Sequence, residues 1–384
     1  MIVGIIGLGT VGYGTLDILT KEKERLEKLI KEEIRVKYGC ALENVELPEG
    51  VIYTTDYRDV INDEEVDVVV ELIGGTTIAK TIILEAIKNG KNVVTANKAL
   101  IAHHAQEIFE AARHNNVKIY YEASVGGGIP VVVPAKENLV ANNILKIEGI
   151  LNGTTNFILS LMETDNLDFD EALHIAEGFG YVEADASLDL DGIDAAHKIY
   201  ILAMNAYETF FDFDSIKTEG IRKVTKKDMD YAKQLGYRIK LIAQAKKLDN
   251  GYGIDVAPTL VKKKGMISHV MQAYNVVEFT CDYLDNVIFY GKGAGRYVTA
   301  SAVVSDIIKT AREDKWIHAY APKQKVVPIT KSRYYVRTTS NLDLDYDIYF
   351  SEGEDNVYIT PEMERSVLDA HVGDAVCQIF KVRG

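Results

Sequence analysis

Short apolar runs alternate with longer amphipathic segments over the first 121 residues. Residues 66–72 (VDVVVEL) are nearly all apolar, as in a parallel strand that is covered on both faces. The segments between such runs have the apolar period of helices, and Asn89-Gly90 is a good helix end. The pattern predicts strands at 2–6, 34–41, 66–72, 92–95 and 117–121, and helices at about 10–33, 78–88 and 99–114. Strands that alternate with helices of this length predict an α/β domain with a doubly wound parallel sheet.

The character of the chain changes after about residue 130. Strand patterns and helix patterns no longer alternate, which favours an α+β domain. Strands are expected at 144–151, 252–260 and 273–280, and helices at 156–163, 170–177 and 193–205. The segment 322–328 (PKQKVVP) is a candidate linker. We therefore expect one domain at 1–135, completed by about 290–320, a second domain at 136–290, and a short tail module at 330–384.

The charge balance narrows the possible partners. The formal net charge is −14, which argues against nucleic acid and against anionic membrane surfaces. No apolar run reaches about 18 residues, and the N-terminus resembles a first strand rather than a signal peptide. Cys40, Cys281 and Cys377 are far apart and in no CxxC pattern. This spacing suggests a reducing cytoplasm and excludes a disulfide framework or a cysteine-ligated zinc site.

A glycine-rich loop follows the first predicted strand. Its sequence, Gly7-Leu8-Gly9-Thr10-Val11-Gly12, is a GxGxxG between a strand and a helix. In that context the glycines permit a tight turn, close approach of a pyrophosphate and close helix–sheet packing, with the phosphates at the helix N-terminus. The loop therefore predicts a Rossmann-type domain that binds NAD or NADP. The end of the second strand has no acid squarely placed for a ribose and no arginine for a 2′-phosphate, so the choice between the two stays open.

Two lysines are candidates for chemistry. Lys198 lies four residues after Asp194 on a predicted helix, so the two side chains share a face. The spacing taken alone favours an exposed ion pair. Lys98 follows the strand at 92–95, at the edge of the sheet where α/β proteins bind ligands. A cation is disfavoured at a helix start, so a purely solvent-exposed role for Lys98 would be unusual.

Five stretches together resemble homoserine dehydrogenases. The resemblance covers about residues 1–320, and its motifs are long, ordered and specific. The stretches are 71–77 (ELIGGTT), 94–100 (VTANKAL), 151–157 (LNGTTNF), 180–198 (GYVEAD running on to GIDAAHK) and 291–302 (GKGAG with TASA).

This resemblance implies NAD- or NADP-dependent interconversion of L-homoserine and L-aspartate 4-semialdehyde. Lys198 would be the acid–base group with Asp194 beside it, Lys98 would lie near both nicotinamide and substrate, and Glu183 would bind the substrate's ammonium group. The remaining substrate contacts would be Gly153, Thr154, Tyr181 and Asp189. The remaining cofactor contacts would be Gly74, Thr76 and Gly295. The domain at 136–290 would bind substrate and form a homodimer or a higher homo-oligomer.

A second glycine-rich loop, 122–130 (EASVGGGIP), leaves the last predicted strand of the sheet. Such a loop can turn several carbonyl oxygens inward, and oxygen ligands suit a hard cation such as Na⁺ or K⁺. By resemblance, the carbonyls of Glu122, Val125, Gly127 and Ile129 would bind this monovalent cation. An interdomain hinge is the alternative, and the two roles are compatible.

Two other functions remain to be weighed. Aspartate-semialdehyde dehydrogenase has a similar architecture but needs a nucleophilic cysteine, and none of the three cysteines lies near a plausible active-site loop. A nucleotide-sensing protein without catalysis would bind the cofactor but gives no reason for Lys98, Asp194 and Lys198.

The tail differs from the regulatory ACT domain that many homoserine dehydrogenases carry after such a linker. That domain is a βαββαβ unit with two helices. Here 334–339 is a predicted first strand, but the acidic segment after it has no helical period, and only 361–370 is expected to be helical before a strand at 375–382. We therefore predict weak or absent inhibition by threonine.

Overall fold

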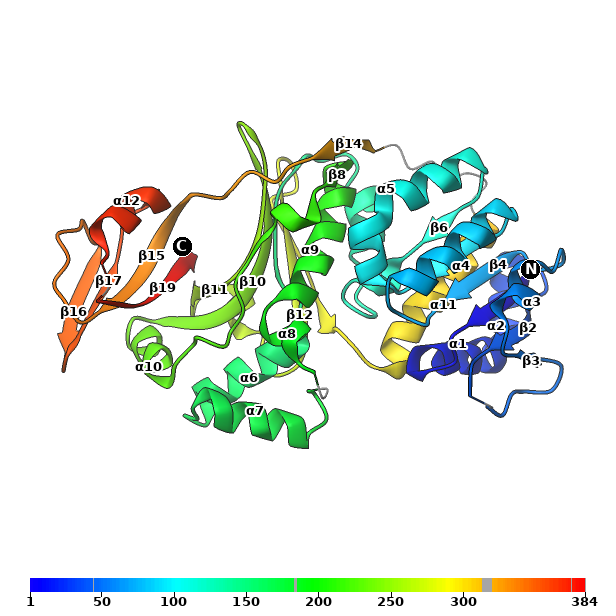
Figure 1. Ribbon diagram of the computed structural model, residues 1–384, viewed down its shortest axis with the longest axis horizontal. Helices are drawn as coiled ribbons and strands as arrows, with labels where there is room; N and C mark the ends of the chain where they lie inside the picture. The colour runs from blue at the N-terminus through cyan, green and yellow to red at the C-terminus, as the bar shows by residue number, and fades with distance from the viewer. Residues whose placement is uncertain (44, 183–184, 313–319, 374, 384) are drawn as a thin grey trace. The chain divides into compact units, whose positions relative to one another are not determined.

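The computed structural model describes residues 1–43, 45–182, 185–312, 320–373 and 375–383 (Figure 1). The chain forms two compact units. The first comprises Met1–Asn143, Tyr200–Phe213 and Gly291–Gln324. The second comprises Ile144–Ile199, Asp214–Tyr290 and Lys325–Gly384. Because the chain passes between the units several times, each is built from segments that are distant in sequence.

The first unit contains a parallel sheet with the order β3-β2-β1-β4-β5-β6, so the doubly wound prediction is confirmed. Its strands are β1 (Ile2–Ile6), β2 (Arg35–Cys40), β3 (Ile52–Thr54), β4 (Val68–Glu71), β5 (Asn92–Thr95) and β6 (Ile119–Tyr120). Its helices are α1 (Thr10–Lys21), α2 (Lys23–Ile30), α3 (Tyr57–Ile61), α4 (Thr77–Lys88), α5 (Lys98–His114) and α11 (Arg296–Arg312). A 3₁₀ turn at Glu122–Ser124, a π-helical turn at Pro134–Asn138, and the strand pair β8 (Thr209–Phe211) and β14 (Ala321–Gln324) complete it. The strand order reverses between β1 and β4, which is where sheets of this kind bind ligands.

The core of the first unit follows the predicted apolar runs. Val3 and Ile5 of β1 lie in one buried cluster with Leu16 of α1 and with Val303 and Ile307 of α11. The segment 291–324 thus returns to the first unit through α11, which packs against α1.

The prediction of one helix from about 10 to 33 is wrong. The helix ends at Lys21, and α2 begins after a single residue, Glu22. The break returns Leu26 to the buried cluster, where it is 4% exposed.

The second unit is built on a mixed sheet that has 11 strands within the described residues. Nine of them follow the order β13-β12-β7-β10-β11-β19-β15-β17-β16, with β9 paired to β11 and β18 to β15. The strands are β7 (Ile144–Ile150), β9 (Lys217–Thr218), β10 (Tyr237–Leu248), β11 (Gly251–Lys262), β12 (Tyr274–Cys281), β13 (Asn286–Lys292), β15 (Lys331–Thr338), β16 (Ile348–Glu352), β17 (Asp355–Ile359), β18 (Met363–Glu364) and β19 (Val376–Arg383). The helices are α6 (Gly153–Thr164), α7 (Phe169–Gly178), α8 (Ser187–Leu190), α9 (Ile193–Ala206, whose last turns belong to the first unit), α10 (Lys226–Gln234) and α12 (Arg365–His371). Short 3₁₀ turns lie at Phe213–Ser215 and Met266–His269.

The tail belongs to the second compact unit. Its last strand, β19, pairs in parallel with β11 and antiparallel with β15, so the tail extends the sheet of the second unit. The stretch between β15 and β16 lies wholly within the described residues and contains no helix, as expected. The helix expected at 361–370 begins only at Arg365, because Met363–Glu364 first pair with β15 as the short strand β18.

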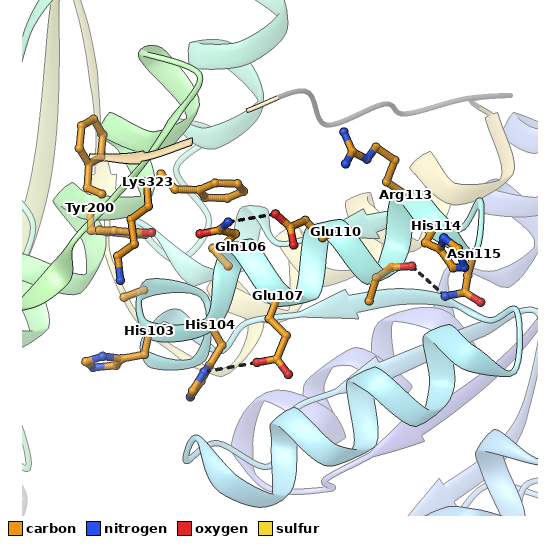
Figure 2. Close-up of a pocket in the computed structure, with 15 residues that line it drawn as sticks. His103, His104, Gln106, Glu107, Glu110, Arg113, His114, Asn115, Tyr200 and Lys323 are labelled. Atoms are coloured by element: carbon orange, nitrogen blue, oxygen red, sulfur yellow. Dashed lines mark hydrogen bonds and ion pairs between the residues drawn. The ribbon is translucent and has the colours of Figure 1, made fainter. Parts of the chain in front are cut away.

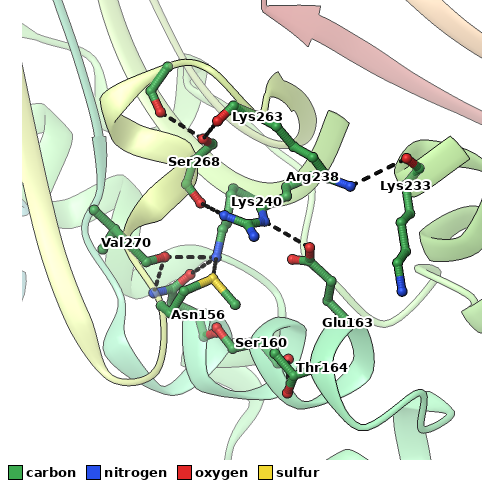
Figure 3. Close-up of polar contacts among 12 residues, drawn as sticks. Asn156, Ser160, Glu163, Thr164, Lys233, Arg238, Lys240, Lys263, Ser268 and Val270 are labelled. Carbon is green, nitrogen blue, oxygen red and sulfur yellow. Dashed lines mark hydrogen bonds and ion pairs between the residues drawn. The ribbon is translucent and has the colours of Figure 1, made fainter. Parts of the chain in front are cut away.

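A buried lysine joins β10 to the start of α6 and to the turn before β12 (Figure 3). The Nζ of Lys240 donates to Oδ1 of Asn156 at 2.9 Å and to the carbonyl oxygen of Val270 at 2.8 Å. Lys240 is 1% exposed, and this burial lowers its pKa to about 8. A lysine whose pKa is lowered by burial is destabilising in its charged form.

Titration of Lys240 should make the stability of the protein depend on pH. Below pH about 8 Lys240 is protonated in both states, whereas between about 8 and the unfolded value of 10.5 only the unfolded chain holds the proton. Stability therefore rises with pH across that window. Between neutral pH and about pH 10, the free energy of unfolding of the wild-type protein should increase by roughly 1–3 kcal/mol more than that of Lys240→Met, which cannot titrate at this position. Urea unfolding of both proteins at neutral pH and at about pH 10 measures this, and equal pH dependence in the two would contradict it.

Candidate active site

The glycine loop of the first unit joins β1 to α1, and its three glycines have different surroundings. A Cβ on Gly7, whose φ is +99°, would lie 2.6 Å from the backbone of Leu72. A Cβ on Gly12 would lie 1.9 Å from the carbonyl oxygen of Gly7. Gly9, by contrast, has no atom within 4 Å of its Cβ position, and as N-cap it gives α1 no side-chain hydrogen bond. The outer glycines are thus required by packing, and the middle one leaves open space at the N–H groups of Thr10 and Val11. This arrangement fits the pyrophosphate of a dinucleotide.

A second open loop follows β4. Gly74 and Gly75 have φ values of +77° and +71°, and neither has an atom within 4 Å of its Cβ position. Thr76 is the N-cap of α4. The predicted cofactor residues Gly74 and Thr76 therefore lie on a loop at the carboxyl edge of the same sheet as the first glycine loop.

Lys98 is the first residue of α5, so it also lies at this edge. The preceding residue, Asn97, caps the helix by accepting from the N–H of Leu100 at 3.1 Å. Its Nδ2 donates to the carbonyl oxygen of Gly75 at 2.7 Å. The sequence prediction missed Asn97, although it lies inside the quoted stretch 94–100. Its amide fixes the backbone at Lys98 relative to the Gly74–Gly75 turn.

The loop with the predicted cation ligands packs closely against the loop before α11. A Cβ on Gly127 would lie 2.6 Å from the carbonyl oxygen of Gly293, and Gly295, with a φ of +132°, precedes α11 directly. The carboxylate of Glu122 is used locally, because it accepts three N–H groups at 2.6–2.9 Å, those of Val131, Val132 and Val133. Burial raises the pKa of Glu122. The side chain thus shapes the loop, and only backbone oxygens of Glu122, Val125, Gly127 and Ile129 remain for the proposed cation.

Asp194 and Lys198 form the centre of the second unit's candidate site. They share one face of α9, and Nζ of Lys198 lies 2.6 Å from Oδ2 of Asp194. Both side chains are about nine-tenths buried, at 12% and 9% exposed, so the pair is not the exposed ion pair that spacing alone favoured. The same Nζ donates to the carbonyl oxygen of Leu151 at 2.7 Å.

Asn152 connects this pair to a second carboxylate. Its Nδ2 donates to Oδ2 of Asp194 at 2.8 Å and to Oδ1 of Asp189 at 2.6 Å. Its Oδ1 accepts the N–H of Thr155 and so caps α6. Asp189 lies in the short helix α8. The sequence prediction assigned Asn152 no role, yet its amide holds both carboxylates at the start of α6.

The remaining predicted substrate residues lie at the same end of α6. Gly153 is tightly packed, because a Cβ there would lie 2.9 Å from the carbonyl oxygen of Ala273. Thr154 donates to the carbonyl oxygen of Tyr181 at 2.9 Å, and the ring of Tyr181 lies 4.5 Å from that of Phe157. Glu183 lies outside the described residues. The structure thus brings together Gly153, Thr154, Tyr181, Asp189, Asp194 and Lys198 within the second unit.

A groove of about 1020 Å³ lies elsewhere, along the outer face of α5 in the first unit (Figure 2). His103, His104, Glu107, Glu110 and Arg113 line it together with Lys323 and ring residues. None of the predicted site residues lines this groove. It is therefore not the candidate active site.

Comparisons with known proteins cover nearly the whole chain. A family model described as homoserine dehydrogenase, NAD binding domain, matches residues 7–122, and one described as homoserine dehydrogenase matches residues 130–308. Homoserine dehydrogenase of Neisseria gonorrhoeae is 38% identical over 97% of this chain and 90% of its own length. The chain belongs to the homoserine dehydrogenase family.

Solved structures of the family agree with the fold. The homoserine dehydrogenase of Thiobacillus denitrificans has a TM-score of 0.94 at 36% identity, with 100% of this chain and 98% of that chain covered. A hyperthermophilic archaeal homoserine dehydrogenase mutant, solved in complex with NADPH, has a TM-score of 0.69 at 26% identity, with 81% and 97% covered. The Rossmann-type fold, the binding of a nicotinamide nucleotide and the oxidoreductase class follow for this chain.

Family membership also removes the alternative of aspartate-semialdehyde dehydrogenase, and the cysteines agree. Burial raises the pKa of Cys40 to about 11 and also raises that of Cys281, which disfavours a reactive thiolate at either position. Cys377 is exposed and lies on β19 in the tail. Within the described residues, no helix is long and apolar enough to cross a membrane. No cluster of three His, Cys, Asp or Glu side chains suited to a metal was found in that same part of the chain.

Proposed function

We propose that this chain interconverts L-homoserine and L-aspartate 4-semialdehyde, with Lys198 as the group that moves the hydroxyl proton. The observation that carries the assignment is the buried Asp194–Lys198 pair on α9. A non-catalytic nucleotide sensor would have no use for a lysine held in this way.

The contacts of Lys198 suit a proton donor to an aldehyde oxygen. In the described part of the chain its ammonium uses two N–H groups, one on Asp194 and one on Leu151. The third N–H is available to the substrate oxygen. In reduction Lys198 gives a proton to the oxygen as the carbonyl becomes an alcohol, and in oxidation the neutral amine takes the proton back. Asp194, held by Asn152, keeps Nζ in place.

The other assignments follow the same family pattern. The nucleotide supplies or accepts the hydride. Its pyrophosphate would be held by Gly7, Gly9 and Gly12 with the N–H groups of Thr10 and Val11, and its remainder by Gly74, Thr76, Lys98 and Gly295. The substrate's ammonium group would be bound by Glu183, and the remaining substrate contacts would be Gly153, Thr154, Tyr181 and Asp189. A Na⁺ or K⁺ ion would be bound by the carbonyls of Glu122, Val125, Gly127 and Ile129.

The test is a turnover assay with L-homoserine and either NAD⁺ or NADP⁺. The rate is measured as formation of the reduced nucleotide. We expect activity with at least one nucleotide, and the ratio of kcat/KM values gives the preference between them. Absence of turnover with both nucleotides, in protein that binds the nucleotide, would contradict the proposed function.

We further propose that the protein acts as a homodimer or higher homo-oligomer in the cytoplasm, where three unpaired cysteines would remain reduced.

Threonine should not inhibit this activity at concentrations below about 1 mM, a range in which a specific effector site would already be occupied. The physical reason is the tail: α12 is its one helix among the described residues after 330, and its strands pair with the sheet of the second unit. The tail therefore lacks the first helix of a βαββαβ effector domain. Titration of threonine into the turnover assay measures this. Repeating it at several homoserine concentrations distinguishes an effector site from competition with the substrate. Half-inhibition in that range would show that the tail still binds an effector.

A further inference from the structure

A completely buried carboxylate lies at the carboxyl edge of the first unit's sheet. Glu71 is the last residue of β4 and is 0% exposed. Its Oε1 accepts the N–H of Ile73 at 2.9 Å and that of Gly74 at 3.2 Å, and its Oε2 accepts the hydroxyl of Thr95 at 2.7 Å. Because β4 pairs with both β1 and β5, this group stands beside the point where the strand order reverses.

The hydrogen bonds continue from Glu71 to the start of α5. The hydroxyl oxygen of Thr95 accepts the N–H of Asn97 at 3.0 Å. Asn97 in turn donates to the carbonyl oxygen of Gly75 and caps α5 through Leu100. One set of bonds therefore fixes both ends of the 73–75 turn and the backbone at Lys98.

The buried position of Glu71 opposes its charge, but the N–H groups around it require an acceptor. Burial raises the pKa of Glu71, so the site disfavours the charged form that its donors favour. An apolar residue would avoid that cost but would leave the N–H groups of Ile73 and Gly74 without this acceptor. Those groups shape a turn of two left-handed glycines whose outer side is open.

We propose that Glu71 is a positioning residue for nucleotide binding, which holds the open 73–75 turn and, through Thr95 and Asn97, the backbone at Lys98. This inference rests on the proposed function for the identity of the ligand. It predicts that the acceptor oxygen matters more than the negative charge. Glutamine can keep Oε1 on the two N–H groups and turn Nε2 toward the hydroxyl of Thr95.

Titration of NADH and NADPH, by nucleotide fluorescence or calorimetry, tests the proposal without any turnover. Glu71→Ala should raise the Kd of the preferred nucleotide by roughly 10- to 100-fold, as expected when buried donors lose their acceptor. Glu71→Gln should stay within about threefold of wild type. In turnover assays, Glu71→Ala should also lower kcat, because Lys98 loses its fixed backbone.

Lys91→Met is the matched control. Lys91 is buried at the amino end of β5, where its Nζ donates to the carbonyl oxygen of Asp63 at 2.7 Å. This variant should lower Tm and leave the nucleotide Kd unchanged. If Glu71→Ala does not fold, Thr95→Val, which breaks the same set of bonds, is expected to raise Kd in the same direction.

An unchanged Kd in folded Glu71→Ala or Thr95→Val would overturn the proposal, as would a Glu71→Gln variant as weak as Glu71→Ala. Nucleotide binding that depends on Glu71 in a protein without homoserine turnover would contradict the proposed function and leave this inference standing.

Discussion

Replacing Lys198 with alanine is expected to lower kcat by roughly 10²–10⁴-fold, the usual contribution of a general acid–base group. The alanine leaves Asp194 and the carbonyl oxygen of Leu151 without their shared donor. Among the described residues, Lys198 makes its hydrogen bonds to Leu151 and Asp194 and not to the glycine loops. The Kd for the nucleotide should therefore remain within about twofold of wild type. Steady-state turnover in both directions and nucleotide titration together measure these two quantities.

Two further variants separate chemistry from folding. Lys262→Ala removes an exposed lysine at the end of β11 in the same unit and should leave kcat and Tm unchanged. Asp194→Asn keeps the shape of the carboxylate but not its charge, so it should lower kcat while retaining the fold. Near-normal turnover in folded Lys198→Ala would remove Lys198 from the mechanism.

Several parts of the fold that local patterns encode were predicted correctly. The apolar runs gave β1, β4 and β5 within two residues at either end, and the strand–GxGxxG–helix order placed the glycine loop correctly between β1 and α1. The i, i+4 spacing of Asp194 and Lys198 placed the two side chains together, because a helix fixes that geometry locally.

Contacts between distant segments could not be read from such patterns. Asn152 reaches Asp189 and Asp194 across 37 and 42 residues, and Lys240 reaches Asn156 across 84. The 12-residue strand β10 was not predicted, although Ile239 and Leu241 alternate with Arg238 and Lys240 along its first half. A buried lysine in the middle of that alternation resembles a solvent-facing position until its partners are known.

The place of the tail is the clearest example of this limit. Its strand β15 was expected, but pairing with the second unit's sheet depends on which edge is available, and this is a property of the whole fold. The structure shows how the tail is anchored: Arg337 of β15 donates to Oδ1 of Asp228 on α10 at 2.7 Å and to Oδ2 at 3.2 Å. It also lies 3.5 Å from Asp355 of β17.

Replacing Arg337 with methionine is expected to lower the free energy of unfolding by about 3–5 kcal/mol. The side chains of Asp228 and Asp355 are 0% and 3% exposed, and Tyr335 donates a hydrogen bond to Asp228 from the same strand. Methionine fills much of the volume of arginine but leaves the charge of Asp228 buried with hydroxyl and backbone donors alone. Urea unfolding at neutral pH measures the loss.

The control and the rescue variant distinguish charge from packing. Arg365→Met breaks a pair with Asp369 whose side chains are 35% and 52% exposed, so it should cost less than about 1 kcal/mol. Adding Asp228→Asn to Arg337→Met removes the buried charge that has lost its arginine partner. The double variant should recover part of the lost free energy of unfolding, because burying that carboxylate without the arginine is the main cost. A loss from Arg337→Met no larger than that from Arg365→Met would mean that the buried pair does not anchor the tail. In that case the pairing of β19 with β11 alone would have to hold the tail on the sheet.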